Sequence, residues 1–234
     1  MRKYLFTIIF TAATGSLSAQ NVTVIGKDGS RHEFKKEEIA SIDFNAPERI
    51  PVTKPEAAEA VDLGLSVKWA TCNVGATKAT EVGAYFAWGE KEEKDLYNWN
   101  TYFDTDCESP LESICGMPDY DVAAAEWGGE WRMPTLAEMQ ELCTKCTWEW
   151  GEQDGTSGYI VKSANGQSIF LPAAGTRQGT NLYLSSTYGS YLTGTRDVTN
   201  HFYAYALVFQ PNGEHWVDNN LRDYGQSIRP VHKE

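Results

Sequence analysis

Residues 127–142 read WGGEWRMPTLAEMQEL, and this stretch decides the fold. Thr135 follows Pro134 and precedes Glu138 by three positions. That spacing is typical of a capping box, in which two side chains bond the free backbone N–H groups at the start of a helix. The sequence therefore predicts a helix over residues 135–145. Its apolar side chains share one face, which indicates packing against a core; they are Leu136, Met139, Leu142, Cys143 and Cys146.

Short segments on both sides of this helix predict strands and one further helix. Residues 121–126 favour a short helix, and the acidic residues 90–120 favour a long irregular surface excursion. Short apolar and aromatic runs predict strands at residues 60–70 (with a turn around Gly64), 82–88, 158–162, 168–171, 203–209 and 227–231. Two helices among many short strands predict an α+β fold with an antiparallel sheet.

The first 19 residues have the pattern of a secretory signal peptide. Arg2 and Lys3 precede a short apolar run, and small residues lead to a cleavage site after Ala19. The run is shorter than the roughly 20 apolar residues that cross a bilayer. We therefore expect a secreted protein (extracellular, cell-surface or periplasmic) with no membrane insertion after cleavage.

Three segments follow the signal peptide. Residues 20–45 alternate around Asp28-Gly29, a strong hairpin signal, and predict a β module too small to hold a core alone. Residues 46–58 contain three prolines and little apolar content, which is typical of a linker. Residues 59–234 are the predicted main domain.

The charge of the chain excludes several classes of partner. Its 234 residues include 20 Lys and Arg against 32 Asp and Glu, a net charge of −12. Without Arg2 and Lys3 the balance is 18 against 32, or −14. A chain with this much negative charge repels phosphate backbones and anionic lipids. We therefore expect no nucleic-acid partner. With 41% hydrophobic and 22% charged residues the chain has a globular composition rather than a disordered one.

The mature part holds five cysteines, an odd count that leaves at least one thiol unpaired within the chain. Cys143 and Cys146 form a C-x-x-C pair at the end of the predicted helix, where the helix dipole disfavours a reactive thiolate. A zinc site would need a second close pair, and Cys107 and Cys115 lie eight positions apart. We expect buried or disulfide-bonded cysteines, with Cys72 bonded to Cys146.

Motifs for catalysis or metal binding are incomplete. Asp104, Asp106 and Glu108 alternate like calcium ligands, but an EF-hand loop would need glycine at 109 and glutamate at 115. An irregular calcium site stays possible in so acidic a chain, although no cofactor is expected. His201 and His215 lie near acidic residues in the sequence, yet no nucleophile elbow accompanies them. We therefore expect no enzyme activity.

Residues 181–224 have the composition of adaptable binding loops. They hold six of the 12 tyrosines, with Trp216 and many Asn, Ser and Gly. Tyrosine offers a large contact area at low entropic cost. Alternating aromatic residues can instead pack on a sheet, which we expect of Tyr205, Leu207 and Phe209. We predict that a ligand contacts Tyr183, Tyr188, Tyr191, Asn200, His215, Trp216, Asn219, Asn220, Arg222 and Tyr224.

Five sequence blocks occur in order along the main domain: VDLGLSVKWATCNVGA (61–76), GAYFAWGE (83–90), WGGEWRMPTLAEMQEL (127–142), IFLPAAGTR (169–177) and GQSIRPV (225–231). Together they resemble the Fibrobacter succinogenes major paralogous domain, a family of secreted bacterial proteins with a C-type-lectin-like fold. RMPTLAEM also looks like the R-L-P-T-E-x-E-W motif of formylglycine-generating-enzyme and sulfatase-modifying domains, which share the fold.

The resemblance implies a scaffold more than an activity. The enzyme branch uses C-terminal cysteines for copper-dependent oxidation, and this chain has no cysteine after Cys146. The last part is similar to retroelement-diversified lectin-like receptors, which display Tyr, Asn, Ser and Asp on an exposed face. In this reading Trp131, Arg132 and Pro134 hold the scaffold.

Two functions follow as hypotheses. The first is a non-catalytic binding module that displays a Tyr/Asn/Trp face to a protein or glycan ligand. The second is a degenerate enzyme-related or structural domain, related to formylglycine-generating enzymes but without their catalytic cysteines. Fold analogy alone does not supply a ligand.

Overall fold

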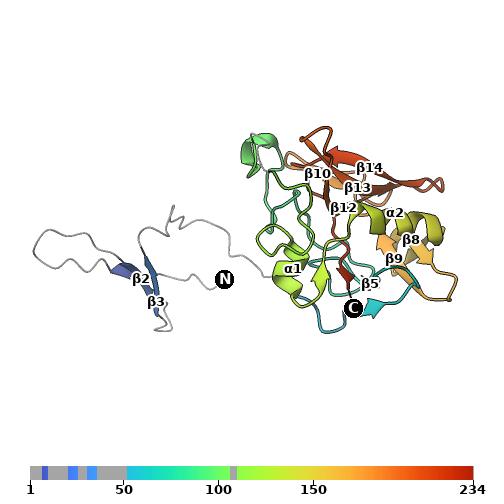
Figure 1. The fold of residues 1–234 in the computed structure, drawn as a ribbon, viewed down its shortest axis with the longest axis horizontal. Helices are drawn as coiled ribbons and strands as arrows, with labels where there is room; N and C mark the ends of the chain where they lie inside the picture. Colours follow the sequence, from blue (N-terminus) through green and yellow to red (C-terminus); the bar gives the residue numbers. More distant parts are fainter. Residues whose placement is uncertain (1–6, 10–20, 26–30, 36–51, 106–109, 234) are drawn as a thin grey trace, which may run out of the picture. The chain divides into compact units, whose positions relative to one another are not determined.

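The computed structural model describes residues 7–9, 21–25, 31–35, 52–105 and 110–233, and the chain forms two compact units, Met1–Arg49 and Ile50–Glu234. The smaller unit is a three-stranded antiparallel sheet of β1 (Thr7–Ile9), β2 (Asn21–Ile25) and β3 (Arg31–Lys35) (Figure 1). The pairing of β2 with β3 is the one expected of a hairpin around Asp28-Gly29, whose residues lie outside the described part. Strand β1 lies within the predicted signal peptide.

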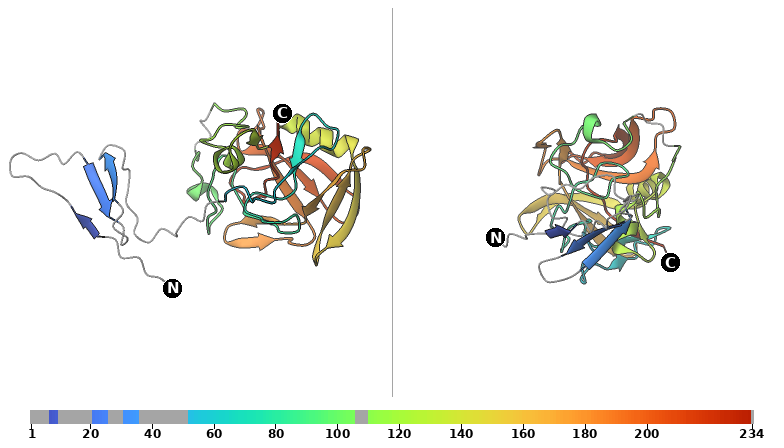
Figure 2. Two further views of the ribbon diagram at one scale, coloured as in Figure 1. Left: turned by 90° about the horizontal axis from the view of Figure 1, so that it is seen from below. Right: turned by 90° about the vertical axis from the view of Figure 1, so that its left-hand side faces the viewer.

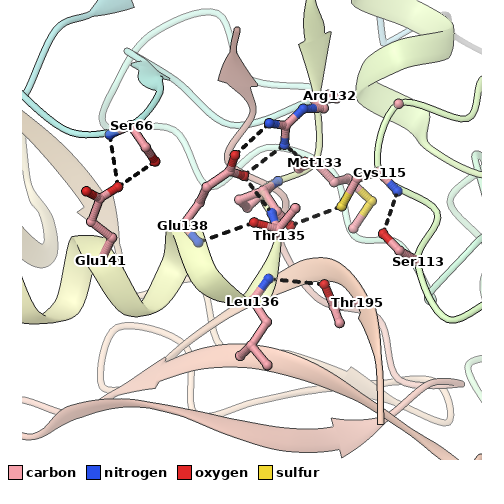
Figure 3. A network of polar contacts seen from close by, with 12 residues as sticks. Ser66, Ser113, Cys115, Arg132, Met133, Thr135, Leu136, Glu138, Glu141 and Thr195 are labelled. Atoms are coloured by element: carbon pink, nitrogen blue, oxygen red, sulfur yellow. Dashed lines mark hydrogen bonds and ion pairs between the residues drawn. The ribbon is translucent and has the colours of Figure 1, made fainter. Parts of the chain in front are cut away.

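Helix α2 (Leu136–Lys145) confirms the helix predicted from the capping box. The Thr135 hydroxyl accepts the Glu138 N–H at 3.2 Å, and the Glu138 carboxylate accepts the Thr135 N–H at 2.8 Å (Figure 3). Met139 and Leu142 are the fully buried residues of this helix. In Figures 1 and 2, α2 lies along the sheet that holds the last long strands of the chain.

The predicted short helix is α1 (Val122–Trp127), one residue later than expected. Asp121 precedes it as the N-cap and accepts the N–H groups of Ala123 and Ala124. A 3₁₀ turn, η2 (Trp99–Thr101), is the regular element in the described part of the irregular excursion 90–120. Among the described residues, no helix has the length and apolar content to cross a membrane.

The strands of the larger unit pair antiparallel in four small sheets, which confirms an α+β architecture. One sheet has the order β4-β5-β15-β6 and joins the two ends of the unit. Its strands are β4 (Ala60–Val61), β5 (Lys68–Ala70), β6 (Trp131–Arg132) and β15 (Val231–His232). The second sheet is a meander of β7 (Thr147–Gln153), β8 (Thr156–Lys162) and β9 (Ser168–Pro172).

The other two sheets lie in the segment 181–224 predicted to form binding loops, except for their first strand, which precedes it. They are the hairpin of β10 (Thr176–Gln178) and β11 (Asn181–Tyr183), and the sheet of β12 (Gly189–Arg196), β13 (Tyr203–Phe209) and β14 (His215–Leu221). β13 matches the predicted strand 203–209, whereas β11, β12 and β14 replace predicted loops. Hairpin pairing with β13 imposes extended backbone on the Asp218-Asn219-Asn220 run of β14, although Asp and Asn are poor strand formers.

The central sheet β12-β13-β14 contributes to two large apolar clusters. Leu192 and Ala204 pack with residues that include Trp88, whereas Leu207 and Phe209 pack with Trp69 and the helix α2. Both clusters also contain residues of the sequence blocks 61–76 and 127–142. The buried side chains of β12 and β13 therefore anchor the sheet, with its edge strand β14, to the core.

Arg229 is a fully buried charge in this scaffold. Its guanidinium donates to the Asn73 side chain at 2.8 Å and to the carbonyls of Ala70 and Phe170 at 3.0 and 2.8 Å. Burial lowers the pKa of Arg229 because the charged form loses its hydration. The three neutral acceptors link the C-terminal block to the blocks around residues 70 and 170.

Two expectations for the main chain are wrong. Residues 82–88 are not a strand, because Phe86 forms only an isolated bridge with Gln226. In the strand predicted at 227–231, Ser227 and Ile228 form isolated backbone hydrogen bonds with β12 and with Val74, and only Val231 belongs to β15. Ala58 is buried in the core and Val52 packs against it, at the described end of the segment predicted as a linker.

The predicted disulfide between Cys72 and Cys146 is not formed. Cys72, Cys115, Cys143 and Cys146 are free thiols, while Cys107 lies outside the described residues. Cys72 is buried in one apolar cluster and Cys146 packs on the other, at the end of α2. Burial raises the pKa of all four thiols, that of Cys143 to about 12, so they are packing residues rather than reactive groups.

Candidate functional site

Exposed apolar side chains concentrate in one part of the described chain. Nine large hydrophobic residues are exposed, and three of them, Leu96, Phe103 and Met117, lie in the irregular excursion. The other six fall between residues 182 and 216: Leu182, Tyr183, Leu184, Val198, Phe202 and Trp216. Clusters of exposed apolar residues on a folded protein mark sites of interaction.

Strand β14 provides the centre of this surface. It lies at the end of its sheet and pairs with β13, so among the described strands its other edge has no partner. Trp216, Asp218 and Asn220 are two positions apart, and side chains at that spacing leave a strand on the same side. The Trp216 indole N–H donates to the Asp218 carboxylate at 3.4 Å.

A short polar network fixes the surface beside these three residues. The Asn220 amide donates to the Ser190 hydroxyl at 3.3 Å and to the Gln226 side-chain oxygen at 3.2 Å. Ser190 also donates to Gln226 at 2.6 Å, and both residues are fully buried. Burial raises the pKa of Tyr188, an effect that a hydrogen bond with Ser190 opposes and the Asp218 charge reinforces.

The β10–β11 hairpin continues the surface. Arg177 of β10 exchanges two backbone hydrogen bonds with Gly225, at 2.8 and 2.9 Å. Burial raises the pKa of the neighbouring Tyr224, with smaller contributions from Asp223 and from Tyr203 and Tyr183. We call the resulting surface the aromatic face; it consists of Tyr183, Tyr188, Trp216, Asp218, Asn220 and Tyr224.

The loop after β11 is held in a strained conformation. Leu184 and Ser186 have φ of 56° and 67°, a left-handed conformation that costs a non-glycine residue about 1–2 kcal/mol. Gly175 makes this path possible, since a Cβ on it would lie 2.3 Å from the Tyr183 carbonyl oxygen. Strain of this kind persists at sites where the surrounding structure fixes it, often for function.

Of the ten predicted ligand contacts, five lie on the aromatic face: Tyr183, Tyr188, Trp216, Asn220 and Tyr224. Asn200 and Asn219 are also exposed, but they surround Asp197. The Asp197 carboxylate accepts the Asn219 amide at 2.9 Å and the Thr199 N–H at 2.8 Å. Hydrogen bonds, first that of the Thr199 hydroxyl, lower the pKa of Asp197 to about 2. These residues tie the β12–β13 connection to β14.

The other three predicted contacts do not belong to this face. Tyr191 is fully buried, stacked on Phe209, and donates to the Pro172 carbonyl at 2.7 Å. His215 projects from the opposite side of β14 and stacks on Trp148 with 4.3 Å between ring centroids. The expectation of exposure fails for both because apolar partners from distant segments cover them.

Arg222 is also buried, contrary to expectation. Its guanidinium lies 5.0 Å from the Trp88 ring centroid and 5.2 Å from that of Tyr102, and it binds Asp104 at 2.5 Å. This ion pair uses the first of the alternating acidic residues that suggested calcium, and Asp106 and Glu108 lie outside the described part. Among the described residues, no group of three or more His, Cys, Asp or Glu is arranged to hold a metal ion.

Sequence reasoning missed part of the face. Asp218, Ser190 and Gln226 are not among the ten predicted ligand contacts. The usable signal was the alternation Trp216-x-Asp218-x-Asn220, which has the two-residue period of a strand. The exposed aliphatic residues Leu182, Leu184 and Val198 gave no signal of their own.

The remaining polar clusters are internally paired. An open hollow of about 450 Å³ between residues 89 and 120 is lined by Glu90, Lys94 and Phe103, among others. Lys94 binds Glu90 at 2.7 Å and donates to the Thr101 carbonyl at 3.1 Å. The nitrogens of His215 lie 3.3 and 3.4 Å from the carbonyl oxygens of Gly213 and Cys143, so they face no carboxylate.

Comparison with known proteins adds no relative: no family model, curated protein or solved structure matches this chain.

Proposed function

We propose that the larger unit is a non-catalytic binding module with a C-type-lectin-like fold, which presents the aromatic face to a protein or glycan ligand outside the cell. The observation that carries this proposal is the concentration of six of the nine exposed large hydrophobic side chains between residues 182 and 216. Binding energy in protein interfaces comes mainly from a few aromatic anchors of this type.

Two features support the fold assignment. The first two strands of the unit, β4 and β5, and its last strand, β15, belong to one sheet in which β5 pairs with β15, so both ends of the larger unit lie in that sheet. The sequence blocks of the resemblance supply fully buried residues, among them Trp69, Trp88 and Arg229. Export rests on the signal-peptide pattern of residues 1–19.

Two features support binding rather than catalysis at this face. Its polar groups are amides, hydroxyls and one carboxylate, and burial raises the pKa of the Tyr188 and Tyr224 phenols, which makes them poorer bases for catalysis. The nearby Asn220 and Ser190 already bond each other and Gln226. Such a surface is rigid before a ligand arrives, which lowers the entropic cost of binding.

The experiment is a screen of the full exported chain on a glycan array and against a random 12-residue peptide library displayed on phage. Each hit is measured again with the double variant Tyr183→Ala/Trp216→Ala and with Met117→Ala, which removes an equally exposed apolar side chain elsewhere. We expect the double variant to weaken every hit at least about tenfold, since anchor truncation costs about 2 kcal/mol.

The control Met117→Ala should bind like the unmodified chain, and thermal unfolding should show that all three proteins are folded. Hits that bind the double variant unchanged contradict the proposal. A screen in which neither probe set yields a hit also contradicts it, and favours a structural role.

A further inference from the structure

The aromatic face lies in a stretch with no exposed Lys or Arg. Residues 178–231 contain no lysine, and their three arginines, Arg196, Arg222 and Arg229, are 4%, 0% and 0% exposed. Glu214 and Asp218 of the same stretch are exposed carboxylates. The whole chain has a net charge of −12. The potential at this face therefore attracts cations.

Asp218 differs from two carboxylates of the scaffold that lie in ion pairs. Glu141 of α2 binds Lys145 at 2.7 Å, and Glu149 of β7 forms an ion pair with Lys162. Asp218 instead accepts the Trp216 indole N–H at 3.4 Å and the Asn219 backbone N–H at 2.8 Å, and it forms no ion pair with any described residue. Its charge is thus available to a ligand.

An aromatic ring lies beside this carboxylate. Trp216, 37% exposed, precedes it on the same side of β14 and donates its indole N–H to it. A carboxylate beside an aromatic ring suits a lysine or arginine side chain: the ring attracts the cation and covers its aliphatic stem, while the carboxylate binds its charge.

We propose that the aromatic face binds a lysine or arginine side chain of a protein partner, with the cation at Asp218 and the stem against Trp216. This inference rests on the proposed function and specifies its ligand. The exposed residues Leu182 and Leu184, which flank Tyr183 in the sequence, favour a protein over a glycan, because sugars stack on aromatic rings and gain little from aliphatic side chains.

The test uses the random 12-residue peptide library displayed on phage. Selected peptides should be enriched in Lys or Arg, and acetylation of the lysines in the strongest synthetic peptide should weaken its binding to the full chain at least about tenfold, as expected when a charge-assisted contact is lost. Asp218→Asn should weaken binding of the unmodified peptide by about tenfold. Glu152→Gln, which removes an equal charge from exposed β7, should change it less than about threefold.

The outcomes separate this inference from the proposed function. If binding of the selected peptide depends on Trp216 but is unchanged by lysine acetylation and by Asp218→Asn, the cation site is wrong and the binding face stands. The same holds if glycans or acidic peptides are the hits that depend on Trp216. If no hit depends on Trp216 or Tyr183, both proposals are wrong.

Discussion

The network at the start of α2 and the aromatic face use the same polar groups in opposite ways. In the first region, Glu138 binds Arg132 through two hydrogen bonds of 2.6 and 2.8 Å and caps the helix with its second oxygen (Figure 3). In the second, Asp218 is exposed and forms no ion pair with a described residue. Carboxylates whose oxygens are all bonded within the protein stabilise the fold, whereas exposed carboxylates without an ion pair are available to a partner. Substitutions should therefore affect stability in the first region and binding in the second.

The largest loss of stability is expected for Asp121→Ala in the first region. The Asp121 carboxylate accepts four backbone N–H groups, those of Gly116, Ala123, Ala124 and Met133. Without the carboxylate, the buried N–H groups among these have no partner, and each costs about 1–3 kcal/mol of stability before the structure relaxes. We expect unfolding in urea to show a loss of about 3–4 kcal/mol.

The matched control for this substitution is Asp119→Ala, two positions earlier and exposed. It should change the free energy of unfolding by less than about 0.5 kcal/mol. A loss below about 1 kcal/mol for Asp121→Ala would show that water replaces the carboxylate, and the proposed contrast would fail.

A smaller loss, about 2 kcal/mol, is expected for Glu138→Gln, which breaks the ion pair with Arg132 and weakens the capping box. Hydrogen bonds from Arg132 and Thr135 outweigh burial and lower the pKa of Glu138 in the folded state. Its contribution is therefore complete above the ordinary carboxyl pKa of about 4.3 and is lost as the pH falls below it. Urea unfolding at pH 7 and pH 3 should show that the difference between Glu138→Gln and the original chain shrinks in acid.

Features that depend on residues close together in the sequence were predictable. Thr135 and Glu138 are three residues apart, so the capping box and α2 follow from the sequence alone. Strand β14 depends on pairing with β13, and Arg222 is buried by its contact with Asp104, 118 positions away. Phe209 and His215 pair across a turn that contains Asn212-Gly213, so the β13–β14 hairpin does have a local signal. The contact between Arg222 and Asp104 has none, so the burial of Arg222 could not be predicted from the sequence.

Asp197 ties the β12–β13 connection to β14 and should have an intermediate effect. Its pKa of about 2 lies below the ordinary value for aspartate, so it stabilises the fold above about pH 4 and loses that effect as the pH falls toward 2. We expect Asp197→Ala to cost about 1 kcal/mol at pH 7, because its partners Thr199 and Asn219 are exposed and can bond water instead. The expected difference from the original chain disappears at pH 2. A difference that is the same at both pH values would show that packing, not charge, holds the β12–β13 connection.

The smallest effect on stability is expected at Leu184, on the loop that carries the aromatic face. Leu184 is 60% exposed and has φ of 56°, a conformation that glycine adopts without strain. In Leu184→Gly, relief of this strain offsets the added flexibility of the unfolded chain, so we expect no loss of stability or a gain of about 0.5 kcal/mol. Val198→Gly, at a residue 56% exposed without positive φ, should instead cost about 0.5–1 kcal/mol. If Leu184→Gly keeps its stability but binds the peptides selected by the original chain more weakly, the strained leucine serves recognition and not folding. An equal loss of stability in both variants would instead show that Leu184 stabilises the fold.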